Sequence, residues 1–164
     1  MSTVSTPSSS GETMIVLQTR KGTAIPNSQS HEISPFEANQ FRDCEKTHPY
    51  ARFRPPPNPI YNCHGLVFAS RRTGIDRSDI LHTVLDDDGY TEIVRDKVLP
   101  GDIILYYNED GDIEHSGIVI TKPDDVQLKI PQVVSKWGKY KEVVHSANDC
   151  PYTFANVRYF RVTK

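Results

Sequence analysis

The pattern of apolar positions changes near residue 61 and divides the chain into a helical part and a part rich in strands. Apolar residues recur at helical spacing over residues 62–72, with Asn62 at the N-cap position and Gly74 just after the last periodic residue. A second helix is predicted to begin between residues 76 and 78 and to end near residue 85, before an Asp-Asp-Asp-Gly turn. Two consecutive helices are therefore expected in the middle of the chain.

The second half alternates short apolar runs with turn sequences such as Leu-Pro-Gly-Asp and Asn-Glu-Asp-Gly-Asp, which is typical of an antiparallel meander. The predicted strands are residues 90–94, 102–107, 115–121, 131–137, 142–145 and 157–162. Helices followed by antiparallel strands predict an α+β fold.

The length predicts one globular domain with an N-terminal arm, because 164 residues fit the usual ~100–200 residues of a domain. Residues 1–29 are rich in Ser, Thr, Pro and Asn and are expected to form a flexible arm, in which the apolar residues 14–17 dock as an edge strand. Residues 30–164 form the domain. A short helix is expected over residues 35–45, and the proline-rich residues 54–59 are expected to be extended.

The charge balance and the apolar pattern exclude several classes of partner. Nineteen Lys and Arg against twenty-one Asp and Glu give a net charge of −2, unlike the basic surplus of nucleic-acid-binding proteins. No apolar stretch approaches the ~20 residues that cross a bilayer, and residues 1–12 lack the pattern of a secretory signal. The odd number of cysteines, three, favours a reducing compartment. We expect a cytoplasmic protein, or one exported without a classical signal peptide; the sequence leaves the oligomeric state open.

The candidate chemistry begins with Cys63 at the start of the first predicted helix of the middle region. Unpaired N–H groups at a helix N-terminus favour the thiolate, which is the nucleophilic form of cysteine. His115 opens a predicted strand, with Gly117 on the same face allowing close approach, and His145 ends a later strand from which it can orient His115. Nucleophile, base and orienting group together make a catalytic triad. The alternative is a buried cysteine that acts only as a small apolar residue.

Three segments in order resemble the sequence blocks of NlpC-type cysteine peptidases, a papain-like superfamily that also contains the CHAP amidases. They are Tyr-Asn-Cys-His-Gly-Leu-Val at 61–67, Pro-Gly-Asp-Ile-Ile-Leu-Tyr-Tyr at 100–107 and His-Ser-Gly-Ile-Val-Ile at 115–120. The resemblance implies a papain-like fold whose N-terminal helix carries the nucleophile and packs on an antiparallel sheet. It also implies Cys63 as nucleophile, His115 as general base and acid, and an oxyanion hole that includes the Cys63 N–H.

The remaining roles that the resemblance implies are less direct. Tyr61 is expected to position the scissile carbonyl, and the third catalytic residue is His145 or Ser135, with His145 preferred. A Ser-Lys-Trp-Gly segment before His145 is similar to segments of uncharacterised relatives, so Ser135 and Trp137 are interpreted as substrate-binding residues, although a tryptophan in the core is an equal alternative for Trp137. The chain departs from the family block by having Asn62 in place of Asp and His64 in place of Ser.

Two groups of residues in the sequence are possible alternatives as metal sites. Cys44, His48, Cys63 and His64 superficially offer four zinc ligands, but adjacent ligands make poor tetrahedral geometry. The acidic turns at 86–89 and 108–112 lack the remaining ligands of a calcium loop and are interpreted as solvated turns. No metal and no cofactor is expected.

The sequence thus predicts a cysteine peptidase or amidase (a thiol hydrolase) that cleaves an amide or isopeptide bond of a peptide or amide substrate through an acyl-enzyme. The resemblance to cell-wall enzymes suggests peptidoglycan peptides. Two alternatives remain: a catalytically silent binding module on the same fold, with the Arg-Pro-Pro-Pro segment at 54–57 as a docking element, and an acyltransferase that uses the same Cys and His.

Overall fold

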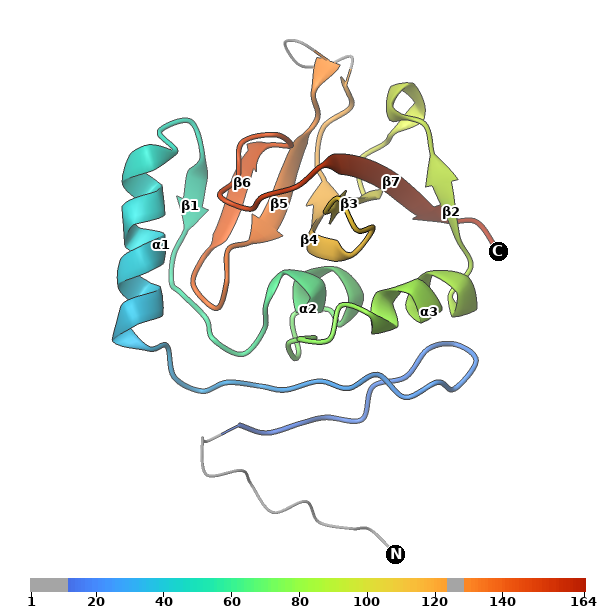
Figure 1. Cartoon of the computed structure of the whole chain (residues 1–164), viewed down its shortest axis with the longest axis horizontal. Coiled ribbons are helices and arrows are strands. Elements are labelled where there is room, and N and C mark those ends of the chain that lie inside the picture. The colour runs from blue at the N-terminus through green and yellow to red at the C-terminus, as the bar shows by residue number, and fades with distance from the viewer. Residues whose placement is uncertain (1–11, 124–128) are drawn as a thin grey trace, which may run out of the picture.

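An antiparallel sheet forms the centre of the protein in a computed structural model that describes residues 12–123 and 129–164 (Figure 1). Its seven strands lie in the order β1-β6-β5-β4-β3-β7-β2. They are β1 (Arg52–Arg54), β2 (Tyr90–Ile93), β3 (Ile103–Tyr107), β4 (Ile113–Val119), β5 (Gln132–Lys136), β6 (Glu142–Ser146) and β7 (Asn156–Val162). The helices are α1 (Pro35–Thr47), α2 (Cys63–Phe68) and α3 (Ile80–Asp87), with a 3-10 turn η1 (Arg95–Lys97). A mixed α and β architecture with an antiparallel sheet is thus confirmed.

Each strand predicted in the second half of the chain is present, but their order is only partly a meander. Strands β3, β4, β5 and β6 are sequential neighbours, whereas β7 lies between β3 and β2. The register joins Tyr159 of β7 to Ile104 on one side and to Ile93 on the other. Strand β1 was not predicted, because its three residues, Arg-Phe-Arg, carry too short an apolar pattern. It pairs with β6 at the sheet edge.

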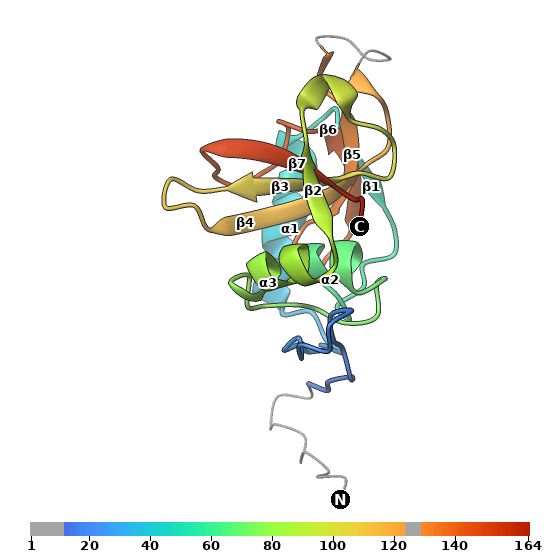
Figure 2. The same cartoon turned by 90° about the vertical axis from the view of Figure 1, so that its right-hand side faces the viewer.

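The two faces of the sheet have different neighbours. Helices α2 and α3 lie next to each other below the strands in both views (Figures 1 and 2). One buried cluster joins Leu81 of α3 to Leu105 of β3, and a separate cluster contains Tyr106, the next residue along β3. This alternation is the usual consequence of strand geometry, in which successive side chains point to opposite faces. Helix α1 contributes Phe41 to a third cluster, around Trp137.

Helix α2 is shorter than the predicted helix at residues 62–72. It ends at Phe68, and the backbone then turns through Ser70 and Arg71, whose φ angles are +51° and +64°. Asn62 is the N-cap as predicted, and its side chain accepts a hydrogen bond from the Gly65 N–H. A Cβ atom on Gly65 would lie 1.9 Å from the carbonyl oxygen of Thr73, so the returning chain requires glycine here.

The described part of the predicted arm, residues 12–29, packs against the domain. Ile25 is buried with the cluster that α3 joins, and Arg20 donates a hydrogen bond to the Lys164 carbonyl. The edge strand predicted at residues 14–17 was wrong. The segment folds back on itself, with isolated bridges such as that between Gln18 and Ala24, and Val16 is 91% exposed. Residues 1–11 lie outside the described part of the chain, and the division at residue 29 stays a prediction.

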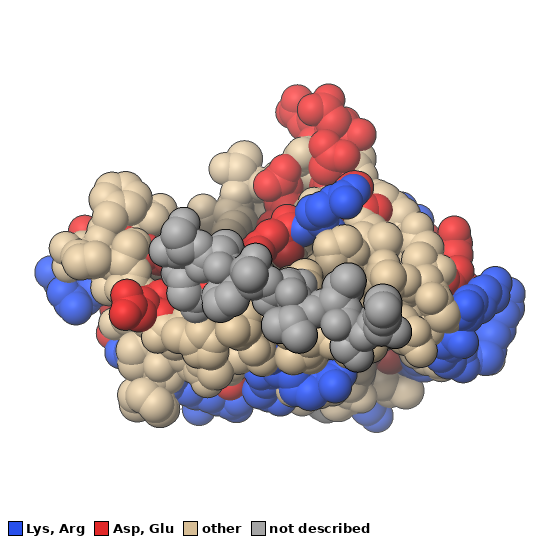
Figure 3. All heavy atoms as spheres, turned by 90° about the horizontal axis from the view of Figure 1, so that it is seen from below, with Lys and Arg blue, Asp and Glu red and all other residues tan. Residues whose placement is uncertain are grey.

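Figure 3 views the molecule from the side on which the N-terminal segment lies and shows acidic and basic side chains on the same face, with uncharged residues between them. Within residues 12–123 and 129–164, no helix is both long enough and apolar enough to cross a bilayer.

Candidate functional site

Cys63 is the first residue of α2, and the residue is 8% exposed. Burial raises the pKa of the Cys63 thiol to about 11. Hydrogen bonds from the backbone and side chain of Ser116 and from the backbone of His64 act in the opposite direction, because they stabilise the thiolate. In this conformation the thiol is therefore neutral near pH 7, and its hydrogen bonds come from β4 and from the first turn of α2.

His115 of β4 is fully buried, and neither of its ring nitrogens has a hydrogen-bond partner among the described residues. Its ring stacks on Tyr152 with 4.0 Å between centroids and 14° between planes, and lies 5.2 Å from the ring of Tyr106. Burial lowers the pKa of His115 well below its ordinary value, and the neighbouring His145 and His64 lower it further. The imidazole is therefore neutral.

Cys63 and His115, the predicted nucleophile and base, share no hydrogen bond in the described part of the chain, and Ser116, next to His115, bonds to Cys63 instead. Ser116 Oγ lies 2.7 Å from His64 Nδ1. His115 is the register partner of Tyr106, so the two side chains lie on the same face of the sheet, and Ser116, the next residue, points to the other face. Tyr152 lies near both Cys63 and His115. It stacks on His115, and its pKa is raised first by burial and next by the charge that Cys63 carries when ionised. The catalytic pairing stays a prediction.

The two candidates for the third catalytic residue, His145 and Ser135, are hydrogen-bonded to each other. Ser135 Oγ lies 2.6 Å from His145 Nε2, and His145 Nδ1 lies 2.7 Å from the Ser146 carbonyl oxygen. Burial lowers the pKa of His145 to about 4. Both nitrogens of His145 are thus occupied without a bond to His115, although His145 is close enough to lower the pKa of His115.

The three residues interpreted as substrate-binding, Tyr61, Ser135 and Trp137, are all buried. Trp137 is a core residue, which was the alternative considered for it. Its indole N–H donates to Ser135 Oγ at 3.1 Å, and its ring packs edge-on against Phe53 at 5.1 Å and His48 at 5.0 Å.

Lys136 is a residue of this region to which the sequence analysis assigned no role. It is fully buried at the end of β5, and its ammonium group donates to the carbonyl oxygens of Asn58 and Tyr61, the latter at 2.8 Å. Burial lowers the pKa of Lys136 to about 8, whereas the nearby Glu142, Glu37 and Cys63 act to raise it. The signal in the sequence was a lysine within the apolar run Val-Val-Ser-Lys-Trp.

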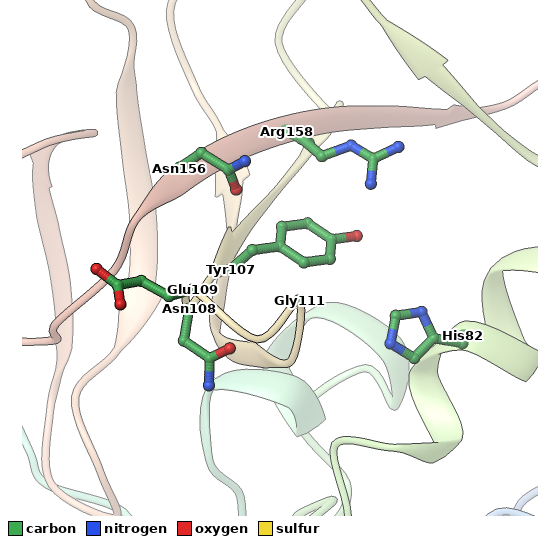
Figure 4. Close-up of a pocket in the computed structure, with 7 residues that line it drawn as sticks. All are labelled: His82, Tyr107, Asn108, Glu109, Gly111, Asn156 and Arg158. Carbon is green, nitrogen blue, oxygen red and sulfur yellow. The ribbon is translucent and has the colours of Figure 1, made fainter.

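An open pocket of about 230 Å³ lies elsewhere, between α3, the turn after β3, and β7 (Figure 4). Its lining residues are His82, Tyr107, Asn108, Glu109, Gly111, Asn156 and Arg158. None of these belongs to the predicted site. The guanidinium of Arg158 is already paired with Glu92 at 2.6 Å, so little charge is free for a ligand.

The four residues weighed as zinc ligands are not assembled into a site. Among the described residues, no group of three or more His, Cys, Asp or Glu side chains is arranged to hold a metal ion.

Comparisons of the chain with protein families, with curated proteins and with solved structures returned no match.

Proposed function

We propose that this protein is a papain-like cysteine hydrolase that cleaves amide bonds of peptides, and that the conformation described above is its closed state. The observation that carries the proposal is His115. Buried polar groups in native proteins are nearly always hydrogen-bonded, and an unpartnered one costs about 1–3 kcal/mol. An imidazole buried without a partner, one residue from the serine that binds the Cys63 thiol, is accounted for by a role in chemistry.

The reaction proceeds in two steps. The His115 imidazole takes the proton of the Cys63 thiol, the thiolate attacks the substrate carbonyl, and the C–N bond breaks as the imidazolium gives its proton to the leaving amine. Water, deprotonated by His115, then attacks the thioester, which releases a carboxylic acid and restores the thiol. The N–H groups at the start of α2 are the donors available to the oxyanion.

In this proposal, Tyr152 closes the site and accounts for two features of Cys63 and His115: both are neutral, and no hydrogen bond joins them among the described residues. The Tyr152 ring covers one face of His115, and its hydroxyl accepts a hydrogen bond from the Gly138 N–H at 2.8 Å. Tyr152 belongs to the connection between β6 and β7, which has no regular secondary structure. In the proposal, movement of this connection uncovers His115, allows the imidazole to reach Cys63 and admits the peptide.

The test is acylation of Cys63 by an activated acyl ester. The wild type, Cys63→Ser and His115→Ala are compared, and peptide mass spectrometry identifies which cysteine carries the acyl group. Cys44 and Cys150 are free cysteines of the same chain and serve as internal controls. We expect selective acylation of Cys63 with turnover, and a loss of about 10²-fold or more in His115→Ala, the usual contribution of a general base. Equal labelling of all three cysteines, unchanged in His115→Ala, would overturn the proposal.

A binding module on the same fold is the second candidate. It is favoured by the raised pKa of Cys63 and by the absence of a hydrogen bond to His115 within the described residues, since both are typical of an inert buried thiol. Under this alternative, Cys63→Ser would leave every property of the protein except its thiol chemistry unchanged.

A further inference from the structure

A chain of hydrogen bonds joins the Cys63 thiol to the imidazole of the next residue through a serine on another element. The Ser116 side chain bonds to Cys63, and its Oγ lies 2.7 Å from His64 Nδ1. All three residues are buried. Ser116 is the register partner of Leu105, so its side chain lies on the face of the sheet that packs against the helices. Strand β4 therefore links the side chains of two neighbouring residues of α2.

The single proton of the Ser116 hydroxyl can be donated to only one of these two neighbours. A serine hydroxyl is one donor and two acceptors, and a neutral imidazole donates from one nitrogen and accepts at the other. If His64 Nδ1 carries no proton, the hydroxyl donates to His64, and its oxygen can only accept from the thiol. If Nδ1 carries the proton, His64 donates to the serine oxygen, and the hydroxyl is free to donate to the sulfur. Only the second arrangement stabilises a thiolate.

His64 is neutral near pH 7, so its tautomer and not its charge sets the direction of these bonds. Burial lowers the pKa of His64 to about 4, although the charge of Asp76 acts to raise it. Three further titratable groups lie near Cys63 or His64 and come from other elements: His115 of β4, Lys136 of β5 and Tyr152 of the connection after β6. Substitution of Ser116 or His64 leaves all of these groups in place.

We propose that Ser116 and His64 are positioning residues of the Cys63 site: His64, in its Nδ1–H tautomer, holds the Ser116 hydroxyl so that it donates to the sulfur and stabilises the thiolate. This inference rests on the function proposed above and adds to it a stabilisation of the thiolate that needs no charged partner. His115 remains the base that removes the proton. The bonds run between α2 and β4, whereas the proposed opening moves the connection between β6 and β7, so they are kept in the open state.

The test is the rate of Cys63 alkylation by iodoacetamide between pH 7 and pH 9, measured by peptide mass spectrometry. Below the midpoint of the thiol titration, this rate is proportional to the fraction of thiolate. We expect Ser116→Ala to react about tenfold more slowly than the wild type or slower still, because a hydrogen bond to a charged group changes its pKa by about one unit or more. His64→Leu should be slowed by a smaller factor. His64→Asn, whose amide N–H replaces Nδ1–H, should restore most of the rate.

A purely structural role would change the rate in the opposite direction. Loss of a buried hydrogen bond destabilises the fold, and a less stable protein opens more often, which speeds the alkylation of a buried thiol. The matched control is Thr73→Val, which removes a buried hydroxyl that donates to Asn27 at 2.8 Å. Its rate should equal or exceed that of the wild type. Urea unfolding measures how far each variant is destabilised.

A measurement on the wild type covers the case in which Ser116→Ala does not fold. The nitrogen NMR shifts of the His64 ring show which of its two nitrogens carries the proton. We expect a protonated Nδ1 and an unprotonated Nε2 at pH 8. The opposite tautomer would direct the Ser116 proton to His64 and away from the sulfur, and would overturn the inference.

The outcomes separate the inference from the proposed function. A wild-type Cys63 that reacts faster than Cys44 and Cys150, at a rate that Ser116→Ala leaves unchanged or increases, overturns the inference and leaves the hydrolase intact. A wild-type Cys63 that reacts no faster than these two cysteines at any pH overturns both.

Discussion

The imidazole of His115 and the phenol ring of Tyr152 are stacked 4.0 Å apart and nearly parallel. A stacked aromatic neighbour occupies the space through which a substrate or a thiol would approach the ring face. The Tyr152 side chain is itself fixed, because its hydroxyl accepts a hydrogen bond from the Gly138 N–H. One face of His115 is therefore covered by a side chain of the connection between β6 and β7, and Tyr106 of β3 packs against the same ring at 5.2 Å.

We predict that Tyr152→Ala will increase the alkylation rate of Cys63 at neutral pH by about tenfold or more, because burial is what keeps the thiol neutral and covered. Tyr152→Phe is the matched control. It keeps the ring on His115 and loses only the acceptor for Gly138, so its rate should stay close to that of the wild type. Peptide mass spectrometry measures both rates. A Tyr152→Ala rate no higher than that of Tyr152→Phe would show that the ring does not limit access.

Three buried histidines should make the protein less stable in mild acid. Burial lowers the pKa of His64 and of His145 to about 4, from an ordinary value of 6.5, and lowers the pKa of His115 well below that value. As the pH falls from 6.5 towards 4, the unfolded chain takes up protons that the folded protein does not, so the free energy of unfolding decreases. The loss approaches about 1.4 kcal/mol per pH unit for each histidine.

Urea unfolding at pH 7 and pH 5 measures this effect, in a range above the pKa values of most carboxylates. From the shifts of His64 and His145 the wild type should lose about 4 kcal/mol between these two pH values, and the lowered pKa of His115 adds to this loss. In His145→Gln, which removes one of the three titrating groups, the loss should be smaller by about 2 kcal/mol. Equal stability of the wild type at both pH values would contradict the prediction.

Both polar atoms of the Asn62 amide make hydrogen bonds at the start of α2. Its Oδ1 accepts from the N–H groups of Gly65 at 2.9 Å and Ile75 at 3.0 Å, and its Nδ2 donates to the Ile75 carbonyl at 2.9 Å. An aspartate, the residue of the family block that this segment resembles, cannot make the last bond. It would also face Asp76, whose Oδ1 lies 3.4 Å from Nδ2.

We therefore predict that Asn62→Asp and Asn62→Ala both reduce the free energy of unfolding, the alanine variant by about 1–2 kcal/mol through loss of the cap. Asn39→Ala, on the exposed surface of α1, is the control and should change stability by less than about 0.5 kcal/mol. Urea unfolding at pH 7 compares the three variants. An Asn62→Asp protein as stable as the wild type would show that the amide donor is not needed.

Local sequence was sufficient for most of the helices and strands. The alternation of apolar and polar residues, the turns at Gly101 and Gly111, and the Asn62 cap are properties of neighbouring residues, so each can be recognised without knowledge of the fold. The early end of α2 was missed because it depends on the chain returning over Gly65 through Thr73. Strand β1 was missed because only its pairing with β6 makes it a strand.

The sequence by itself determined that the chain forms a mixed α and β domain, with Cys63 at the start of a helix and His115 within a strand. Which side chains meet was decided only by the tertiary structure, since the register of β4 turns Ser116 towards α2 and His115 towards Tyr152. Burial then set the charge states, because the pKa values of a thiol, an imidazole and an ammonium group depend on their distance from water and from one another. These distances are set by segments far apart in the chain, and no local pattern contains them.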